Sequence, residues 1–131
     1  MQPKIRVWVV FGRELKFGAG RAQLLRLIDE RGSLPKAAVE FGMSYRNAWG
    51  YLQELEQAAG FRFVERRPGA GPRSGMRLTS AGRDFLACYA KFRGGLEEAT
   101  RRHFAGAFKG KEFRTWPRSP ERSARARAAG G

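Results

Sequence analysis

Two short helical segments separated by a tight turn constrain this chain more than any other feature. Residues 32–49 read GSLPKAAVEFGMSYRNAW. Ser33 and Ser44 stand where N-caps are expected, because a hydroxyl oxygen can accept a hydrogen bond from a free N–H of the first turn. Gly42 stands where a helix ends, since glycine adopts the left-handed conformation of a helix C-terminus. The spacing predicts a helix from Ser33 to Gly42 and a longer one from Ser44 to about Ala59.

The segments on either side of this pair predict a further helix and two hairpins. Residues 4–11 (KIRVWVVF) and the following LKFG predict a small β-hairpin. The apolar pattern of residues 21–31 predicts a helix that ends at Gly32. After Gly60, FRFVERR (residues 61–67) and MRLT (residues 76–79) predict two short strands around the glycine-rich loop 68–75. Helix, turn, helix and a basic hairpin in this order predict a winged helix-turn-helix.

The longer helix of the pair has apolar side chains at spacings of three and four. We expect one face to pack inward. Trp49 is predicted to be structural, and Tyr45 is predicted both to pack in the core and to stack on a base. The members of this predicted face are Tyr45, Trp49, Leu52, Leu55 and Ala59.

A long helix is predicted from Thr79 or Ser80 to about residue 108. Apolar residues recur along it at alternating spacings of four and three, which is typical of a heptad seam between two helices. We expect Gly94 and Gly95 to kink the helix or to permit close backbone approach, and Cys88 to be a small core residue. The predicted dimer interface consists of Phe85, Tyr89, Phe92, Leu96, Ala99 and His103.

The fold class expected is therefore mainly α (α+β). We predict one domain over residues 1–108, with the dimerisation helix at about residues 80–108. Residues 109–131 lose the apolar period and predict a basic, disordered tail.

The charge balance indicates the kind of partner. Lys and Arg number 26 against 12 Asp and Glu, which gives a net charge of +14. Such an excess favours a polyanion, with nucleic acid preferred over an anionic membrane surface. No apolar run approaches the roughly 18 residues of a membrane span, and no secretory leader is recognised, so we expect a cytoplasmic protein without a membrane partner.

One cysteine and one histidine are too few for an internal disulfide or a zinc cluster. Cys88 and His103 lie fifteen positions apart on one predicted helix, about 22 Å at 1.5 Å per residue, so they cannot form a nucleophile–base pair within one chain. We expect no enzyme, no metal and no cofactor.

The second helix of the pair fits a DNA major groove, where arginine pairs with guanine and asparagine with adenine. Basic residues around the wing and on the preceding helix are candidates for phosphate contact. Surface arginines of a basic protein are often only solvated charges, and this alternative stays open for each of them. The candidate DNA-binding residues are Ser33, Lys36, Ser44, Tyr45, Arg46, Asn47, Arg66, Arg67, Arg73 and Arg77.

Residues 20–89 resemble the N-terminal DNA-binding domain of the molybdate-responsive ModE family of regulators, whose winged helix is similar to the LysR type. The motifs that carry the resemblance are IDERGSLPKAA, GMSYRNAW, the glycine-rich wing and RLTSAGRDFL. The resemblance implies that residues 44–47 lie on a recognition helix and that hairpin and long helix join two subunits. Pro68 and Pro72 depart from the glycine runs of the family's wing.

The function expected is a homodimeric, sequence-specific transcriptional regulator of ModE type, connected with molybdenum-related genes. The alternatives are a non-specific architectural DNA-binding protein and a winged helix used for protein assembly. The molybdate-binding domains of the family are expected to be missing, because residues 110–131 are too few for a small β-barrel. A single-domain regulator, a separate sensor protein, a different effector and constitutive activity remain open, so this chain alone does not support molybdate or another effector.

Overall fold

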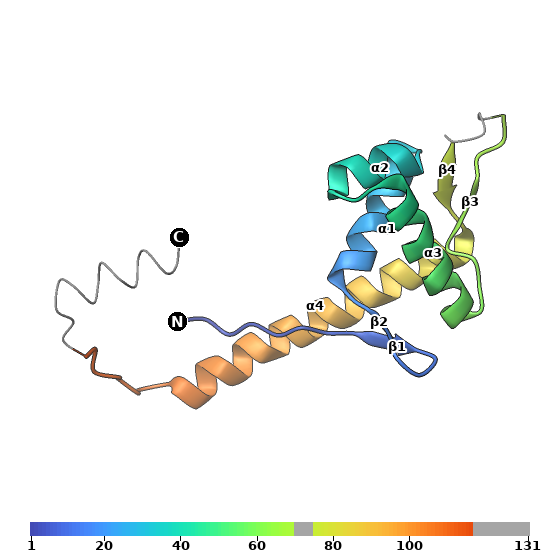
Figure 1. Ribbon diagram of the computed structural model, residues 1–131. Helices are drawn as coiled ribbons and strands as arrows, with labels where there is room; N and C mark the ends of the chain where they lie inside the picture. The colour runs from blue at the N-terminus through green and yellow to red at the C-terminus, as the bar shows by residue number, and fades with distance from the viewer. Residues whose placement is uncertain (70–74, 117–131) are drawn as a thin grey trace.

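The computed structural model describes residues 1–69 and 75–116. It has a mainly helical fold with two small hairpins, which confirms the predicted fold class (Figure 1). Along the chain the elements are β1 (Val9–Phe11), β2 (Leu15–Phe17), α1 (Ala19–Arg31), α2 (Leu34–Phe41), α3 (Tyr45–Ala59), β3 (Val64–Arg66), β4 (Met76–Leu78) and α4 (Ser80–Phe108).

The predicted helix boundaries rest on capping residues, and the structure confirms them. The hydroxyl of Ser33 accepts a hydrogen bond from the N–H of Lys36 at 3.3 Å, and that of Ser44 from the N–H of Asn47 at 3.0 Å. Thr79, rather than Ser80, caps α4. Three glycines with positive φ end the first three helices: Gly32, Gly42 and Gly60.

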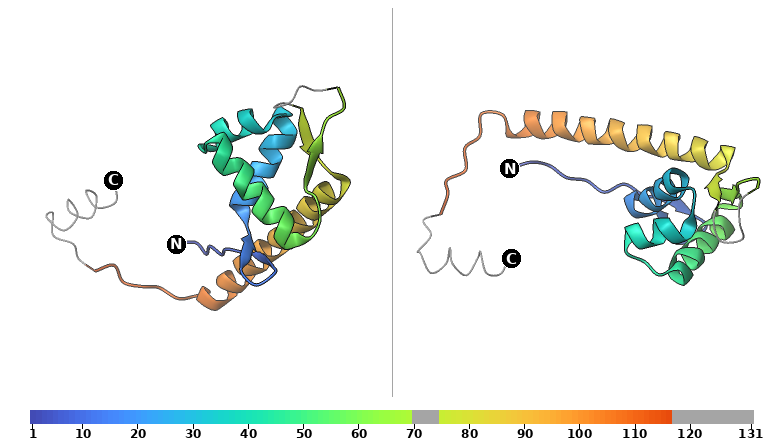
Figure 2. Two further views of the ribbon diagram at one scale, coloured as in Figure 1. Left: turned by 45° about the vertical axis from the view of Figure 1, so that its right-hand side comes forward. Right: turned by 90° about the horizontal axis from the view of Figure 1, so that it is seen from above.

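Both hairpins are antiparallel but shorter than the sequence predicts. Val10 lies opposite Lys16 in the first hairpin, and Glu65 lies opposite Arg77 in the wing. The alternating pattern of residues 61–67 breaks at Phe63 and Val64, which are both buried. The residues before β1 form no ladder, and they run beside α4 (Figure 2).

An aromatic cluster joins the hairpin, the end of α3 and the start of α4. Phe17 and Phe63 are fully buried, and their ring centroids lie 6.0 Å apart. Phe85 contacts both rings at 4.8 and 5.4 Å, while Phe11 and Phe61 close the cluster at its edge. The cluster therefore fixes α4 against the rest of the domain.

The prediction for the inward face of α3 is wrong for two of its residues. Tyr45 is 41% exposed and Trp49 is 40% exposed. Ala48, Leu52 and Leu55 form the buried face instead. Ala48 precedes Trp49 by one residue, about 100° around a helix, so burying Ala48 turns the indole outward.

Helix α4 is continuous over 29 residues and extends away from the compact part of the domain (Figures 1 and 2). No protein atom would contact a Cβ at Gly94 or Gly95, so the close approach expected there does not occur within the described chain. Cys88 is exposed rather than buried, because the adjacent Tyr89 takes the inward position. No helix in residues 1–69 or 75–116 is long and apolar enough to cross a membrane.

Candidate nucleic-acid interface

The turn between α2 and α3 brings a polar helix end to the surface. Backbone hydrogen bonds close the turn, from the N–H of Gly42 to the carbonyl of Val39 and from Met43 to Ala38, at 3.1 and 2.8 Å. Ser44 then caps α3, so the direction of its first turn is fixed by local bonds.

Arg46 and Asn47 both lie exposed in this first turn. Arginine offers five N–H donors in a planar fork, and asparagine offers both a donor and an acceptor. Ser44 and Tyr45 are exposed beside them. The four residues predicted for the recognition helix are therefore all exposed at the N-terminus of α3.

The two candidates on α2 differ in their accessibility. Lys36 is exposed in the first turn of α2. Ser33 is only 3% exposed, and its hydroxyl serves as the helix cap. The capping role thus accounts for a serine at position 33. A DNA contact by Ser33 stays a prediction, because almost none of this residue is accessible to a ligand.

The wing presents its basic residues from both strands. Arg66 and Arg77 are exposed, and Arg77 pairs with Glu65 across the hairpin at 3.1 Å. The side chain of Arg67 lies against Gly32, where a Cβ would meet its guanidinium at 2.6 Å. Arg73 lies outside the described residues.

One carbonyl ties the wing to the helix pair. The backbone N–H groups of Gly75 and Met76 both donate to the carbonyl of Gly32, at 2.8 and 2.9 Å. The N–H of Arg67 donates to the carbonyl of Gly75 at the loop end of the hairpin. Gly32 also ends α1, so the loop end of the wing strands is hydrogen-bonded to the segment that enters α2.

Two carboxylates, which the sequence did not single out, hold the wing strands at their other end. Glu56 of α3 accepts hydrogen bonds from the backbone N–H groups of Phe63 and Val64, at 2.6 and 3.2 Å. Asp29 of α1 accepts from the N–H of Leu78 at 3.1 Å. In the sequence, Glu56 and Asp29 are each an acidic residue on a largely apolar helix face. That pattern is too common to identify them as acceptors for the wing strands.

An ion pair joins α1 and α2 beside Lys36. The guanidinium of Arg31 donates to both carboxylate oxygens of Glu40, at 2.6 and 2.7 Å. This hydrogen-bonded pair lowers the pKa of Glu40 and raises the pKa of Arg31. Because both oxygens of Glu40 accept hydrogen bonds from Arg31, this carboxylate neutralises the charge of Arg31 and not that of the basic residues at the N-terminus of α3.

The predicted dimer seam divides into two parts. Phe85 and Tyr89 pack within their own chain, and the hydroxyl of Tyr89 donates to the carbonyl of Val7 at 2.8 Å. Phe92 and Leu96, on the next two turns, are 49% and 38% exposed. Further along the helix Ala99 is half-buried and His103 is exposed.

Within the described residues, no three His, Cys, Asp or Glu side chains come together as a metal site would require.

Comparison with known proteins agrees with this architecture. Residues 21–83 match the family model described as bacterial regulatory helix-turn-helix protein, lysR family. The molybdenum-pterin-binding protein MopB of Rhodobacter capsulatus is 35% identical over 81 residues, covering 62% of this chain and 30% of MopB. The DNA-binding transcriptional dual regulator ModE of Escherichia coli is 30% identical over 89 residues, covering 68% of this chain and 34% of ModE.

The chain thus spans about a third of the length of these curated relatives. Among solved structures, the DNA complex of the CbnR DNA-binding domain aligns with a TM-score of 0.49 at 24% identity. That alignment covers 66% of this chain and 93% of the CbnR domain.

Proposed function

We propose that the protein binds double-stranded DNA as a homodimer and regulates transcription, and the match of residues 21–83 to the LysR-type helix-turn-helix model supports this. The observation that carries the proposal is the exposed first turn of α3. Arg46 and Asn47 stand there on a backbone held by the Ser44 cap, so little ordering is required before they meet base edges.

The roles of the two side chains follow from their chemistry. Arg46 donates two hydrogen bonds to a guanine, and Asn47 donates to and accepts from an adenine. Tyr45 lies beside them at the edge of the same surface. Each good bidentate pair contributes roughly 1–3 kcal/mol of discrimination against the wrong base.

The wing and α2 bind the phosphate backbone on either side of the groove. Lys36 reaches it from α2, and the exposed arginines of the wing reach it from the hairpin. The proposed phosphate contacts of the wing are Arg66, Arg67, Arg73 and Arg77. These contacts set the register of the protein on the duplex and its dependence on salt.

The homodimer is supported by the apolar surface that α4 leaves uncovered. Phe92 and Leu96 are too large and too exposed to be explained by packing within one chain. Joined through this stripe with Ala99 and His103, two copies read two half-sites about 10 bp or a multiple apart.

Genes connected with molybdenum are the proposed targets. This step rests on the relatives, since MopB is a molybdenum-pterin-binding protein by name and ModE is a transcriptional regulator. It is independent of the contact residues above.

A non-specific architectural role is the second candidate, and the net charge of +14 is the observation that favours it. Electrostatic binding of that kind weakens steeply with salt and is lost to competitor DNA, whereas base-specific binding survives moderate salt.

The test is a selection from random duplexes at about 0.15 M salt, where surface charge is partly screened. It is run with and without molybdate. We expect enrichment of a two-fold symmetric site. Tight binding without enrichment of any sequence would replace the proposal by the architectural role.

The selected site then permits a variant test. Arg46→Ala should weaken binding by roughly 5- to 150-fold, which corresponds to the 1–3 kcal/mol expected of a base-reading arginine, and should relax specificity at one position. Gln57→Ala, on the last turn of α3, is the matched control. Equal losses on selected and scrambled duplexes would rule out a base contact by Arg46.

A further inference from the structure

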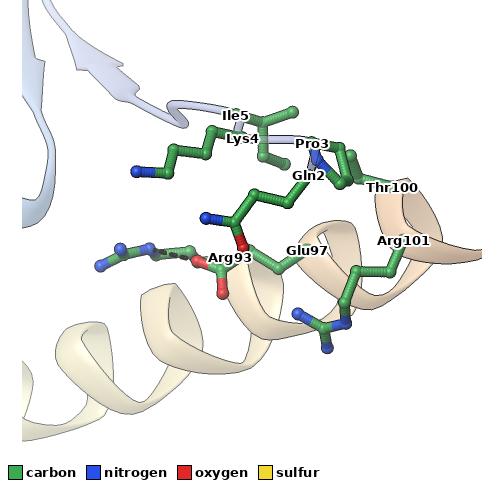
Figure 3. A pocket seen from close by; sticks show the side chains of 8 residues that line it. All are labelled: Gln2, Pro3, Lys4, Ile5, Arg93, Glu97, Thr100 and Arg101. Carbon is green, nitrogen blue, oxygen red and sulfur yellow. Dashed lines mark hydrogen bonds and ion pairs between the residues drawn. The ribbon is translucent and has the colours of Figure 1, made fainter. Parts of the chain in front are cut away.

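The N-terminal segment and α4 border a cavity, open to solvent on one side, that the proposed function does not use. Residues 2–5 lie over the second half of α4 without pairing in a ladder, and a space of about 330 Å³ remains between them (Figure 3). The lining residues are Gln2, Pro3, Lys4, Ile5, Arg93, Glu97, Thr100 and Arg101.

The charged side chains of this cavity do not balance. Arg93 and Glu97 neutralise each other, with the guanidinium Nε 2.7 Å from the carboxylate (Figure 3). Lys4 and Arg101 have no ion-pair partner anywhere in residues 1–69 and 75–116. The cavity therefore carries two uncompensated positive charges, one from each wall.

The shape of the cavity restricts the anion that fits. A volume of about 330 Å³ is at the lower end of small-molecule pockets, which run from roughly 300 to 1,000 Å³. A tetrahedral inorganic anion would leave most of that space empty. Pro3 and Ile5 supply an apolar wall, and the amide of Gln2 extends from the same segment towards Arg93 and Glu97 (Figure 3).

The cavity is separate from both surfaces already described. It lies at the far end of the molecule from the wing and the N-terminus of α3 (Figure 1). On α4, Arg93 and Glu97 each follow a seam residue, Phe92 and Leu96, by one position. One residue is about 100° of helix rotation, so the cavity wall and the seam are neighbouring faces of the helix and not the same face.

From these observations we propose that the cavity binds a small organic dianion, with a short aliphatic dicarboxylate as the chemical class. One carboxylate meets the planar guanidinium of Arg101, which binds carboxylates in a two-pronged geometry, and the other meets the ammonium of Lys4. The methylene chain between them lies on Pro3 and Ile5. Because Lys4 and Arg101 belong to different elements, the bound ligand holds the N-terminal segment against α4.

The test is a titration of the full-length protein with glutarate, followed by NMR of the backbone amides in the absence of DNA. We expect saturable shifts confined to residues 2–5 and 93–101. Glutaramide, the neutral isostere, should produce none of them. Sulfate at equal ionic strength serves as the inorganic dianion and should bind at least tenfold more weakly.

Three variants assign the charges. Arg101→Gln and Lys4→Gln should each weaken glutarate at least tenfold, because each removes a charge-assisted contact. Arg102→Gln is the matched control, since Arg102 is the next residue on α4 and does not line the cavity. All three positions are exposed, and unchanged melting temperatures establish that the variants fold.

The proposal is overturned if glutarate gives no saturable shift in the wild-type protein, or if sulfate matches glutarate. It is also overturned if Arg102→Gln weakens binding as much as Arg101→Gln, since the effect would then be one of general charge. None of these outcomes bears on DNA binding, because the titration contains no DNA.

Discussion

Replacing Gly82 by alanine should separate the wing from the start of α4. Gly82 is buried in the first turn of α4, where a Cβ would lie 3.2 Å from both Cα and the carbonyl carbon of Phe63 and would overlap the carbonyl oxygen. That oxygen accepts the N–H of Thr79 at 2.9 Å, and the hydroxyl of Thr79 donates to the carbonyl of Arg62 at 2.6 Å. The added methyl therefore pushes on the backbone that joins the two elements.

The magnitude follows from three contributions. An alanine in a helix interior is favoured over glycine by roughly 0.5–1 kcal/mol. Overpacking against a fixed backbone costs roughly 1–3 kcal/mol, and loss of the Thr79 cap costs about 1 kcal/mol. The free energy of unfolding should fall by about 1–3 kcal/mol, which lowers the melting temperature on the order of 10 °C for a domain of this size.

Thermal denaturation at one fixed protein concentration measures the effect, because association shifts the apparent stability. Gly94→Ala is the control. It lies on the same helix, on the side opposite the Phe92 stripe, and no atom lies within 4 Å of its added Cβ. This control should melt slightly above the wild type. If Gly82→Ala melted at the same temperature as Gly94→Ala, the steric argument would be refuted.

Three further changes test other parts of the fold. Glu56→Ala leaves two backbone N–H groups without their acceptor and should cost about 2 kcal/mol in urea denaturation; a loss below 0.5 kcal/mol would show that water replaces the carboxylate. Arg21→Lys should cost roughly 1–2 kcal/mol, because lysine cannot both stack on the Tyr51 ring (3.9 Å) and donate in two directions; an unchanged urea midpoint would contradict this. For Glu40, whose pKa is lowered in the folded state, the stabilisation is present above its ordinary pKa of 4.5 and is lost as the pH falls through the folded pKa. Melting curves of wild type and Glu40→Gln should therefore converge at acid pH, and a constant gap from pH 3 to 7 would exclude the ion pair with Arg31 as its cause.

The helix limits could be predicted from the sequence because they are set by local bonds. Ser33 and Ser44 accept hydrogen bonds from residues three positions along the chain, and glycines end the helices they cap. The same locality placed Arg46 and Asn47 in an exposed first turn. None of these features depends on how distant elements pack.

The faces of the helices were harder to predict because several registers satisfy a spacing of three and four. On α3, the series through Trp49 and the series through Ala48 both lead to Leu52. The structure buries Ala48, whose small side chain lies with Ala37 and Ala38 among the buried residues of the helix pair. Only the tertiary contact decides between such registers, and the indole is left outside.

The seam of α4 shows a related difficulty. One heptad pattern runs through Phe85, Tyr89, Phe92 and Leu96, yet the first two contact the aromatic cluster and the last two face solvent. The sequence carries no mark at the point where the compact domain ends. Asp29 and Glu56 were missed for the same reason, because their acceptor roles require strands that are remote in sequence.

The hydrogen bonds at Gly32 fix the separation between the helix pair and the wing. Two N–H groups at the loop end of the hairpin donate to one carbonyl at the end of α1, and the hydrogen bond from Arg67 to Gly75 joins the two strands there. This separation is set during folding, so ordering the loop end of the wing adds no further entropy cost to the proposed binding of a duplex. Changes of sequence in the loop between Arg67 and Gly75 can then alter how far the wing extends without changing its separation from the helix pair, so the proposed backbone contacts of the wing can vary independently of the proposed base contacts of α3.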